Sequence, residues 1–238
     1  MNTFKNKTVL VTGASSGIGE AIAHRFIKEG ANVVAFDLKK PEYECTFYKV
    51  DVRNENEIEE VISKIPTLDV VVNSAGIYFL ESVENTSKKK LDDIVDINLK
   101  GTFLICKYTL PLLRKSKGNI VNIASGLGVV PEPGSPAYCA TKAAVIMLTK
   151  CLSQEHGKEG IRVNAVLPGP IDTPLLRNSF TSENDLKISI SKNPLRKIGK
   201  AEDVANVVYF LASDEASFVT GGLYSVDGGE SVSSVYSN

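Results

Sequence analysis

Tyr138 and Lys142, in the stretch "AYCATKA" (residues 137–143), place a phenol and an amine four residues apart. Four residues is about one helical turn, so the two side chains share a face if this segment is a helix. A free tyrosine hydroxyl has a pKa of about 10 and is a poor base at neutral pH. A lysine ammonium ~5 Å away, at an effective dielectric constant of ~20, would stabilise the phenolate by roughly 3 kcal/mol, or about two pKa units. The pair is either an ordinary solvated pair or an acid/base couple, and the elements that position it decide between the two.

The composition excludes several classes of partner. The 238 residues carry 27 Lys and Arg against 28 Asp and Glu, and this balance gives no broad field for binding nucleic acid or an anionic membrane. No segment approaches the ~18 to 20 consecutive apolar residues of a membrane span. The cysteines form no C-x-x-C unit and the two histidines lie far apart, so we expect no metal site. We expect a soluble, cytoplasmic protein that acts on a small molecule.

Apolar, β-branched runs alternate with segments of helical periodicity along the whole chain. Strands that are apolar throughout are typical of a parallel sheet covered on both faces, so the pattern predicts a doubly wound α/β fold and one domain spanning residues 1–238. The expected strands cover residues 7–13, 32–38, 46–52, 68–76, 118–125, 161–169 and 223–229. The expected helices cover residues 15–31, 55–65, 87–115 with interruptions at Gly101 and Pro111, 135–157 with Ser135 as N-cap, and 201–213.

Two connections depart from this alternation. Residues 39–45, between the second and third strands, are too few for a crossover helix and predict a loop. Residues 170–200 are polar, contain two further prolines after Pro170 and carry no clear pattern, so we expect an irregular excursion there. Such long excursions are often functional, and residues 171–200 are predicted to form a substrate lid.

The stretch "TGASSGIG" (residues 12–19) follows the first strand and opens the first helix. Its glycines are spaced G-x-x-x-G-x-G, which is neither the G-x-G-x-x-G fingerprint nor a P-loop, because Ile18 and Gly19 stand where a P-loop needs Gly and Lys. Backbone N–H groups and the helix dipole at this point favour a pyrophosphate. The residues predicted to contact it are Gly13, Ser15, Ser16, Gly17, Ile18 and Gly19.

Asp37 ends the second strand, 18 residues after Gly19, and is followed by Leu38. A carboxylate at this position accepts hydrogen bonds from the ribose hydroxyls of an adenosine and repels a 2′-phosphate. Asp37 and Leu38 are therefore predicted to contact NAD, which is favoured over NADP. Lys39 and Lys40 weaken this preference, because a lysine could neutralise the phosphate.

Six stretches, taken in order, resemble the short-chain dehydrogenase/reductase family over essentially the whole chain: "TGASSGIG", "NSAG" (73–76), "NIAS" ending at Ser125, "YCATK" (138–142), "LPGPIDTP" (167–174) and "VTGGLYSVDGG" (219–229). The resemblance implies a Rossmann-type fold of about seven parallel strands with helices on both faces, and a homotetramer. The family's catalytic tetrad corresponds here to Asn98 (in "INLKG"), Ser125, Tyr138 and Lys142.

The resemblance also implies the remaining cofactor contacts. Asp51 and Val52 would hold the adenine; the residues beside the ribose would be Asn73, Ala75 and Gly76, and those at the nicotinamide end Pro168, Gly169, Ile171 and Thr173. Ser74 departs from the family's N-N-A-G, where an asparagine helps to hold the central sheet, and we expect a structural rather than catalytic effect.

The expected reaction is hydride transfer between NAD and a secondary alcohol or ketone. The resemblance implies that Tyr138 exchanges the hydroxyl proton and that Ser125 hydrogen-bonds the substrate oxygen. It also implies that Lys142 lowers the tyrosine pKa and binds the ribose, and that Asn98 holds a water linking Lys142 to solvent. The substrate is expected between the lid and a wall formed by Gly126, Leu127 and residues 131–134, with Glu132 as a polar contact.

Two alternatives remain open. A ketoreductase acting on carrier-bound 3-oxoacyl groups is one, although such relatives generally take NADPH and Asp37 opposes it. A noncatalytic dinucleotide sensor is the other, although such a protein could dispense with the Tyr138–Lys142 pair. The sequence does not identify the substrate.

Overall fold

A computed structural model describes residues 3–180 and 182–233 of the chain. Within these residues, seven parallel strands form one sheet in the order β3-β2-β1-β4-β5-β6-β7, which confirms the doubly wound, Rossmann-type fold. The strands are β1 (Thr8–Thr12), β2 (Asn32–Asp37), β3 (Thr46–Lys49), β4 (Val70–Asn73), β5 (Asn119–Ile123), β6 (Arg162–Pro168) and β7 (Leu223–Val226).

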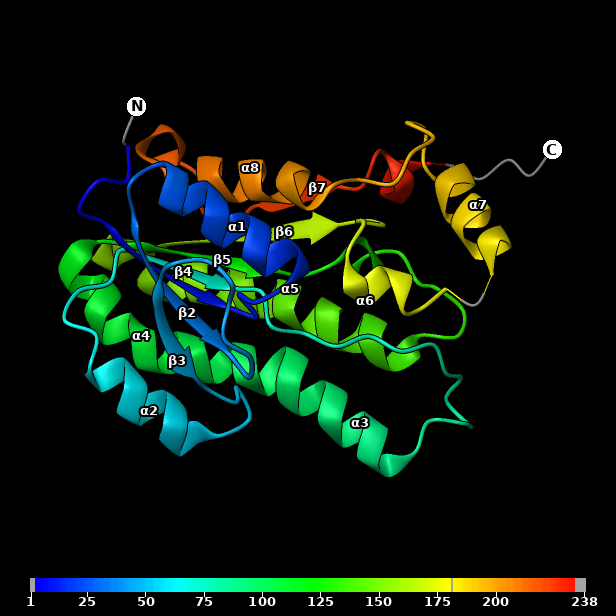
Figure 1. Ribbon diagram of the computed structural model, residues 1–238, viewed down its shortest axis with the longest axis horizontal. Helices are drawn as coiled ribbons and strands as arrows, with labels where there is room; N and C mark the ends of the chain where they lie inside the picture. The colour runs from blue at the N-terminus through cyan, green and yellow to red at the C-terminus, as the bar shows by residue number, and fades with distance from the viewer. Residues whose placement is uncertain (1–2, 181, 234–238) are drawn as a thin grey trace.

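Helices cover both faces of the sheet, with α1 and α8 on one face and α2, α4 and α5 on the other (Figure 1). Two further helices, α6 and α7, stand beyond the carboxyl end of β6. The helices are α1 (Gly17–Lys28), α2 (Glu55–Ser63), α3 (Lys88–Val95), α4 (Thr102–Ser116), α5 (Pro136–His156), α6 (Pro174–Arg177), α7 (Glu183–Lys192) and α8 (Ala201–Ala212). None of the helices in the described part of the chain is long and apolar enough to cross a membrane.

The two-sided burial explains why the strands are apolar throughout. Along β1, Val9 and Val11 pack into the cluster beneath α1 and α8, whereas Leu10 packs into the cluster beneath α2, α4 and α5. All three side chains are fully buried. Successive side chains of a strand point to opposite faces, so a sheet covered on both sides needs apolar residues at consecutive positions.

The long helical segment expected over residues 87–115 is continuous but changes its winding. A π-helical turn at Asp96–Gly101 joins α3 to α4, at the glycine where an interruption was predicted. Pro111 lies inside α4 and does not end it, contrary to the prediction. The buried side chains of Ile105 and Leu113, on either side of the proline, pack against the sheet and stabilise the helix through this position.

The loop expected between β2 and β3 is present, because residues 38–45 contain no helix. The third strand is shorter than predicted and ends at Lys49, which leaves Val50, Asp51 and Val52 beyond it. Ser135 precedes α5 as expected, but its side chain does not cap the helix and instead donates to the Glu132 carbonyl oxygen at 3.3 Å.

The prediction of an irregular excursion over residues 170–200 was wrong, since it contains α6 and α7. Thr173 caps α6 by accepting a hydrogen bond from the Leu176 N–H at 3.3 Å, and Ser182 with Asp185 forms a capping box at the start of α7. No residue of either helix is buried, so neither needs the apolar stripe by which a helix is recognised in a sequence. Local capping defines these helices, rather than burial.

Candidate active site

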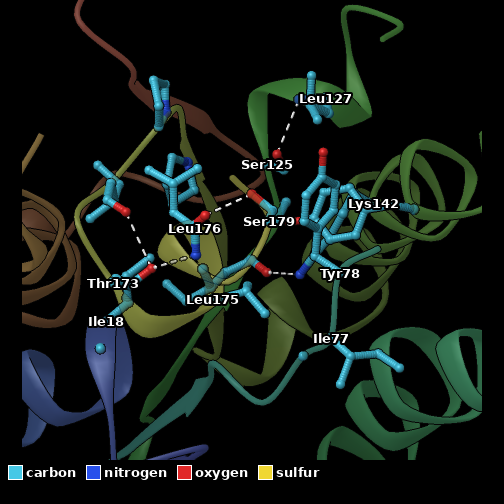
Figure 2. A pocket seen from close by; sticks show the side chains of 18 of the residues that line it. Ile18, Ile77, Tyr78, Ser125, Leu127, Lys142, Thr173, Leu175, Leu176 and Ser179 are labelled. Carbon is cyan, nitrogen blue, oxygen red and sulfur yellow. Dashed lines mark hydrogen bonds between the residues drawn. The ribbon is translucent and has the colours of Figure 1, made fainter. Parts of the chain in front are cut away.

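A cleft of about 1020 Å³ lies at the carboxyl ends of the strands, as expected for an open parallel sheet. Figure 2 shows it between the segment around α6, with Thr173, Leu175, Leu176 and Ser179, and the opposite wall with Tyr78, Ser125 and Lys142. Most residues predicted from the sequence to bind or react line this cleft: Gly13, Ser16, Gly17, Ile18, Gly19, Asp37, Leu38, Asp51, Val52, Ala75, Gly76, Ser125, Tyr138, Lys142, Pro168, Gly169, Ile171 and Thr173.

The turn between β1 and α1 requires glycine for two different reasons. Gly13 has φ +65°, and a Cβ there would lie 2.8 Å from the Ala75 Cα in the turn after β4. A Cβ on Gly19 would lie 2.1 Å from the Gly13 carbonyl oxygen, closer than any real contact. The glycines therefore let the start of α1 fold back against the strand ends and present bare backbone to the cleft.

The start of α1 has the properties of an anion-binding site. Ser16 is the N-cap residue, yet its side chain makes no capping hydrogen bond, so no capping side chain occupies the position in front of the first N–H groups. Ser16, Gly17 and Ile18 all line the cleft. Bare backbone, a helix N-terminus and a cleft of this volume together fit the pyrophosphate of a dinucleotide.

Asp37 is held in place by two backbone N–H groups. Its Oδ2 accepts from Ser15 at 2.9 Å and its Oδ1 from Lys39 at 3.1 Å. Ser15 does not line the cleft; its hydroxyl donates to the Lys39 carbonyl oxygen, so it joins the glycine turn to the segment after β2. A carboxylate fixed by two donors keeps further acceptor positions open toward the cleft.

Asp51 lines the cleft beyond β3 as part of an ion pair. Arg53 Nη2 lies 2.7 Å from Asp51 Oδ2, and the hydrogen bonds from Arg53 hold the pKa of Asp51 below its ordinary value. Arg53 also lines the cleft and reaches Asp93 at 3.3 Å. No sequence motif marks Arg53, so it was not predicted to belong to the site.

Asn73, which was predicted to lie beside the ribose, is not among the residues that line the cleft. It is buried, and its Nδ2 donates to Asn122 Oδ1 at 2.8 Å and to Cys106 Sγ at 3.3 Å. Asn122 Nδ2 donates in turn to Thr149 Oγ1 at 2.9 Å, which links β4, β5 and α5. Asn73 therefore links strands of the sheet. Ser74 stands where the family has a sheet-holding asparagine, and here it lines the cleft.

Asn98 also lies outside the cleft, behind Gly76. Its Oδ1 accepts from the Ile77 N–H at 2.8 Å and its Nδ2 donates to the Ile77 carbonyl oxygen at 3.0 Å. The π-helical turn directs this side chain inward, where only 1% of the residue is exposed. Asn98 thus fixes the segment that follows β4. A Cβ added to Gly76 would lie 3.3 Å from Asn98 Oδ1 and 3.6 Å from Lys142 Nζ.

Ser125, Tyr138 and Lys142 converge in the cleft wall from β5 and α5. Ser125 follows β5 and its Oγ accepts from the Leu127 N–H at 3.1 Å (Figure 2). Lys142 Nζ lies 5.6 Å from the centre of the Tyr138 ring and donates to the Ile123 carbonyl oxygen at 2.8 Å. The four-residue spacing in α5 therefore brings the phenol and the amine together, as the sequence predicted.

The electrostatics of the pair differ from the prediction. Desolvation by burial raises the pKa of Tyr138 to about 12, partly offset by a hydrogen bond with Ser125. Burial also lowers the pKa of Lys142 to about 8. The expected lowering of the tyrosine pKa toward neutrality is thus wrong for the protein alone. The reason is that burial removes both side chains from water and so disfavours the charged form of each.

The substrate end is more polar than the sequence indicated. Tyr78 packs edge-on against Tyr138 with ring centres 4.8 Å apart, and its hydroxyl donates to Glu132 Oε2 at 3.4 Å. Glu132 Oε1 accepts from Lys192 Nζ of α7 at 2.6 Å. Glu230 also lines this end, and its burial raises its pKa. The surrounding apolar walls consist of Ile77, Leu80, Leu127, Val130, Leu175, Leu176, Phe180 and Ile188.

Comparison with known proteins identifies the family. Residues 13–231 match the sequence model of a family described as enoyl-(acyl carrier protein) reductase, a group of short-chain dehydrogenases/reductases. The chain belongs to the short-chain dehydrogenase/reductase family. This confirms the resemblance seen in the sequence and makes the protein an oxidoreductase of the hydride-transfer type.

Relatives within the short-chain dehydrogenase/reductase family match almost end to end. The 3-oxoacyl-(acyl-carrier-protein) reductase FabG of Thermotoga maritima is 37% identical, and the match covers 94% of this chain and 98% of that protein. The meso-2,3-butanediol dehydrogenase of Serratia marcescens is also 37% identical, with 97% and 96% covered. The ligand-free structure of Thermoplasma acidophilum aldohexose dehydrogenase superposes with a TM-score of 0.94 at 36% identity, covering 98% of this chain and 97% of that one.

Proposed function

We propose that the protein interconverts a secondary alcohol and a ketone with NAD as hydride carrier and Tyr138 as general acid/base. The observation that carries this proposal is that one cleft joins the glycine turn at Gly13 to Ser125 and Tyr138. A nicotinamide dinucleotide supplies the hydride acceptor or donor when bound. The chain's own residues then have to bind it, orient the substrate and move one proton.

The proton chemistry follows from the two shifted pKa values. With its pKa near 12, Tyr138 is protonated at neutral pH and can donate to the developing alkoxide of a ketone. Ser125, which follows β5 and lines the cleft, would hydrogen-bond the same oxygen. In the oxidation direction Tyr138 must lose its proton, and Lys142, with its pKa near 8, is partly neutral and able to accept one.

The preference for NAD over NADP rests on Asp37. Its carboxylate lines the cleft and is held there by the Ser15 and Lys39 N–H groups, so a 2′-phosphate would meet a fixed negative charge. Lys39 and Lys40 are exposed beside it. The backbone of Lys39 is bonded to both Asp37 and Ser15, which leaves only its side chain free to turn toward a phosphate.

A second candidate is reduction of carrier-bound 3-oxoacyl groups, because a FabG is among the relatives at 37% identity. Asp37 opposes it, since FabG relatives typically use NADPH. The other alternative, a noncatalytic dinucleotide sensor, has less support because Ser125, Tyr138 and Lys142 are all present in the cleft wall.

The deciding experiment combines binding with turnover. NADH and NADPH are titrated by fluorescence, and a panel of secondary alcohols, diols, sugars, hydroxy acids and 3-oxoacyl thioesters is then followed by nicotinamide absorbance. We expect tighter binding of NADH, and we expect Tyr138→Phe to lose turnover at least about 100-fold, the effect of removing a general acid/base, while NADH still binds. Retained activity in Tyr138→Phe would show that Tyr138 is not the general acid/base. Tighter binding of NADPH than of NADH would contradict the proposed preference for NAD.

Several further properties belong to the same proposal. Residues 1–238 act as one dinucleotide-binding and catalytic domain, and residues 171–200, with α6 and α7, act as the substrate lid. A cytoplasmic homotetramer is expected from the family resemblance, and light scattering of the purified protein tests the oligomeric state.

A further inference from the structure

The loop between β2 and β3 replaces a crossover helix, and it contacts the glycine turn directly. Tyr43 in this loop donates its hydroxyl hydrogen to the Ala14 carbonyl oxygen at 2.7 Å. Asp37, at the start of the same segment, accepts from the Ser15 N–H at 2.9 Å. The carbonyl of Ala14 and the N–H of Ser15 belong to one peptide group, so that group is bonded at both of its ends.

This peptide group needs external support. It follows Gly13, whose φ is +65° and whose own backbone is conformationally free because glycine has no Cβ. It precedes Ser16, Gly17 and Ile18, which open α1 and line the cleft, so their backbone N–H groups are available to an anion bound there. Rotating the peptide would turn these donors away from an anion. The Ala14 residue is fully buried, so its carbonyl oxygen would lose a hydrogen-bond donor at a buried position if the Tyr43 hydroxyl were removed.

Tyr43 is itself held firmly. Its ring lies 4.6 Å, centre to centre, from the ring of His24 on α1, and it packs against the core beneath α1 and α8. Burial and the nearby acidic groups Glu20 and Asp37 raise the pKa of Tyr43, so its hydroxyl remains a donor at any physiological pH. The residue does not line the cleft.

We propose that Tyr43 is a positioning residue for the dinucleotide: with Asp37 it clamps the Ala14–Ser15 peptide and thereby aims the N–H groups at the start of α1. The inference rests on the proposed nucleotide site and adds a residue that never touches the cofactor. It also gives the loop at residues 38–45 a role in cofactor affinity, through the bond from Tyr43 to Ala14.

The test is Tyr43→Phe, which removes the hydroxyl and keeps the ring on His24. The dissociation constant for NADH, from fluorescence titration, should rise about 5- to 20-fold, as for one lost hydrogen bond to a buried carbonyl. In turnover the change should fall on KM for NAD rather than on kcat. The matched control is Tyr108→Phe. The Tyr108 hydroxyl donates to Glu55 on the exposed side of α4, so its removal should leave the dissociation constant for NADH unchanged.

Amide hydrogen exchange of residues 13–19, measured on the folded protein, is the second readout. Exchange in this segment should accelerate in Tyr43→Phe and not in Tyr108→Phe, whatever the change in melting temperature. If the unmodified protein binds NADH, and Tyr43→Phe binds it equally well with unchanged exchange, the positioning role is overturned. If the unmodified protein binds neither NADH nor NADPH, the proposed function itself fails, so the two failures are distinguishable.

Discussion

Glu132 Oε1 and Lys192 Nζ lie 2.6 Å apart, which joins the loop before α5 to the helix α7 across the mouth of the cleft. The same carboxylate accepts from the Tyr78 hydroxyl, and Tyr78 packs on Tyr138. A continuous set of contacts therefore runs from the proposed lid to the proposed general acid/base.

Lys192→Met should weaken substrate binding more than cofactor binding. The pair is partly exposed, with side-chain exposures of 37% and 24%, so we expect KM for the substrate to rise about 2- to 5-fold. Lys187→Met, which removes an exposed lysine from the same helix, is the matched control. Steady-state kinetics of both variants check this, and equal effects of the two would show that the ion pair does not hold the lid.

Gly19→Ala should abolish dinucleotide binding. The added Cβ would lie 2.1 Å from the Gly13 carbonyl oxygen, so the turn or the helix must shift. We expect the NADH dissociation constant to rise more than about 100-fold, with a loss of stability of a few kcal/mol from overpacking. Gly157→Ala is the control, because its Cβ meets nothing within 4 Å. NADH titration and thermal unfolding of both variants test the difference, and normal binding by Gly19→Ala would contradict the placement of the turn.

Asn73→Ala should destabilise the fold and spare the cofactor site. Asn73 is buried and bonds Asn122 between β4 and β5, so its removal leaves a buried acceptor unpaired at a cost of about 1–3 kcal/mol. NADH affinity should stay within about twofold, since a side chain outside the cleft contributes no direct contact. Chemical denaturation and NADH titration measure the two effects. A large loss of NADH affinity at constant stability would restore the role that the family resemblance implied.

Lys142→Met should remove turnover and yet stabilise the protein below about pH 8. Burial lowers the pKa of Lys142 to about 8 in the folded state from 10.5, so the unfolded chain binds more protons between these values. The free energy of unfolding of the unmodified protein therefore rises with pH between about 8 and 10.5. Below about pH 8 the cost of burying the charge is fully present, of the order of a few kcal/mol.

Urea unfolding of Lys142→Met and the unmodified protein at pH 7, 8.5 and 9.5 follows this difference, which should shrink as the pH rises. Tyr138 does not interfere, because its raised pKa contributes only above pH 10, where stability falls as the unfolded tyrosine ionises first. A pH-independent difference between the two proteins would show that Lys142 is not charged and buried as described.

The sequence by itself determined the class of the fold and most of the cleft. Buried parallel strands need consecutive apolar residues, and the helices that cover them need apolar residues at helical spacing. Both patterns can be recognised within a short stretch of sequence. Gly13 and Gly19 were also recognisable, since a turn this tight excludes a Cβ. The four-residue spacing of Tyr138 and Lys142 needed only the geometry of one helix.

Only the tertiary structure decided where individual polar side chains point and what charge they carry. Asn73 and Ser74 are adjacent, yet Asn73 bonds Asn122 in the interior whereas Ser74, just past the end of β4, lines the cleft. The pKa values of Tyr138 and Lys142 depend on how completely the folded chain removes them from water, which no spacing reveals. The bonds from Tyr43 to Ala14 and from Glu132 to Lys192 join residues 29 and 60 positions apart, so they exist only once the sheet has brought distant loops together.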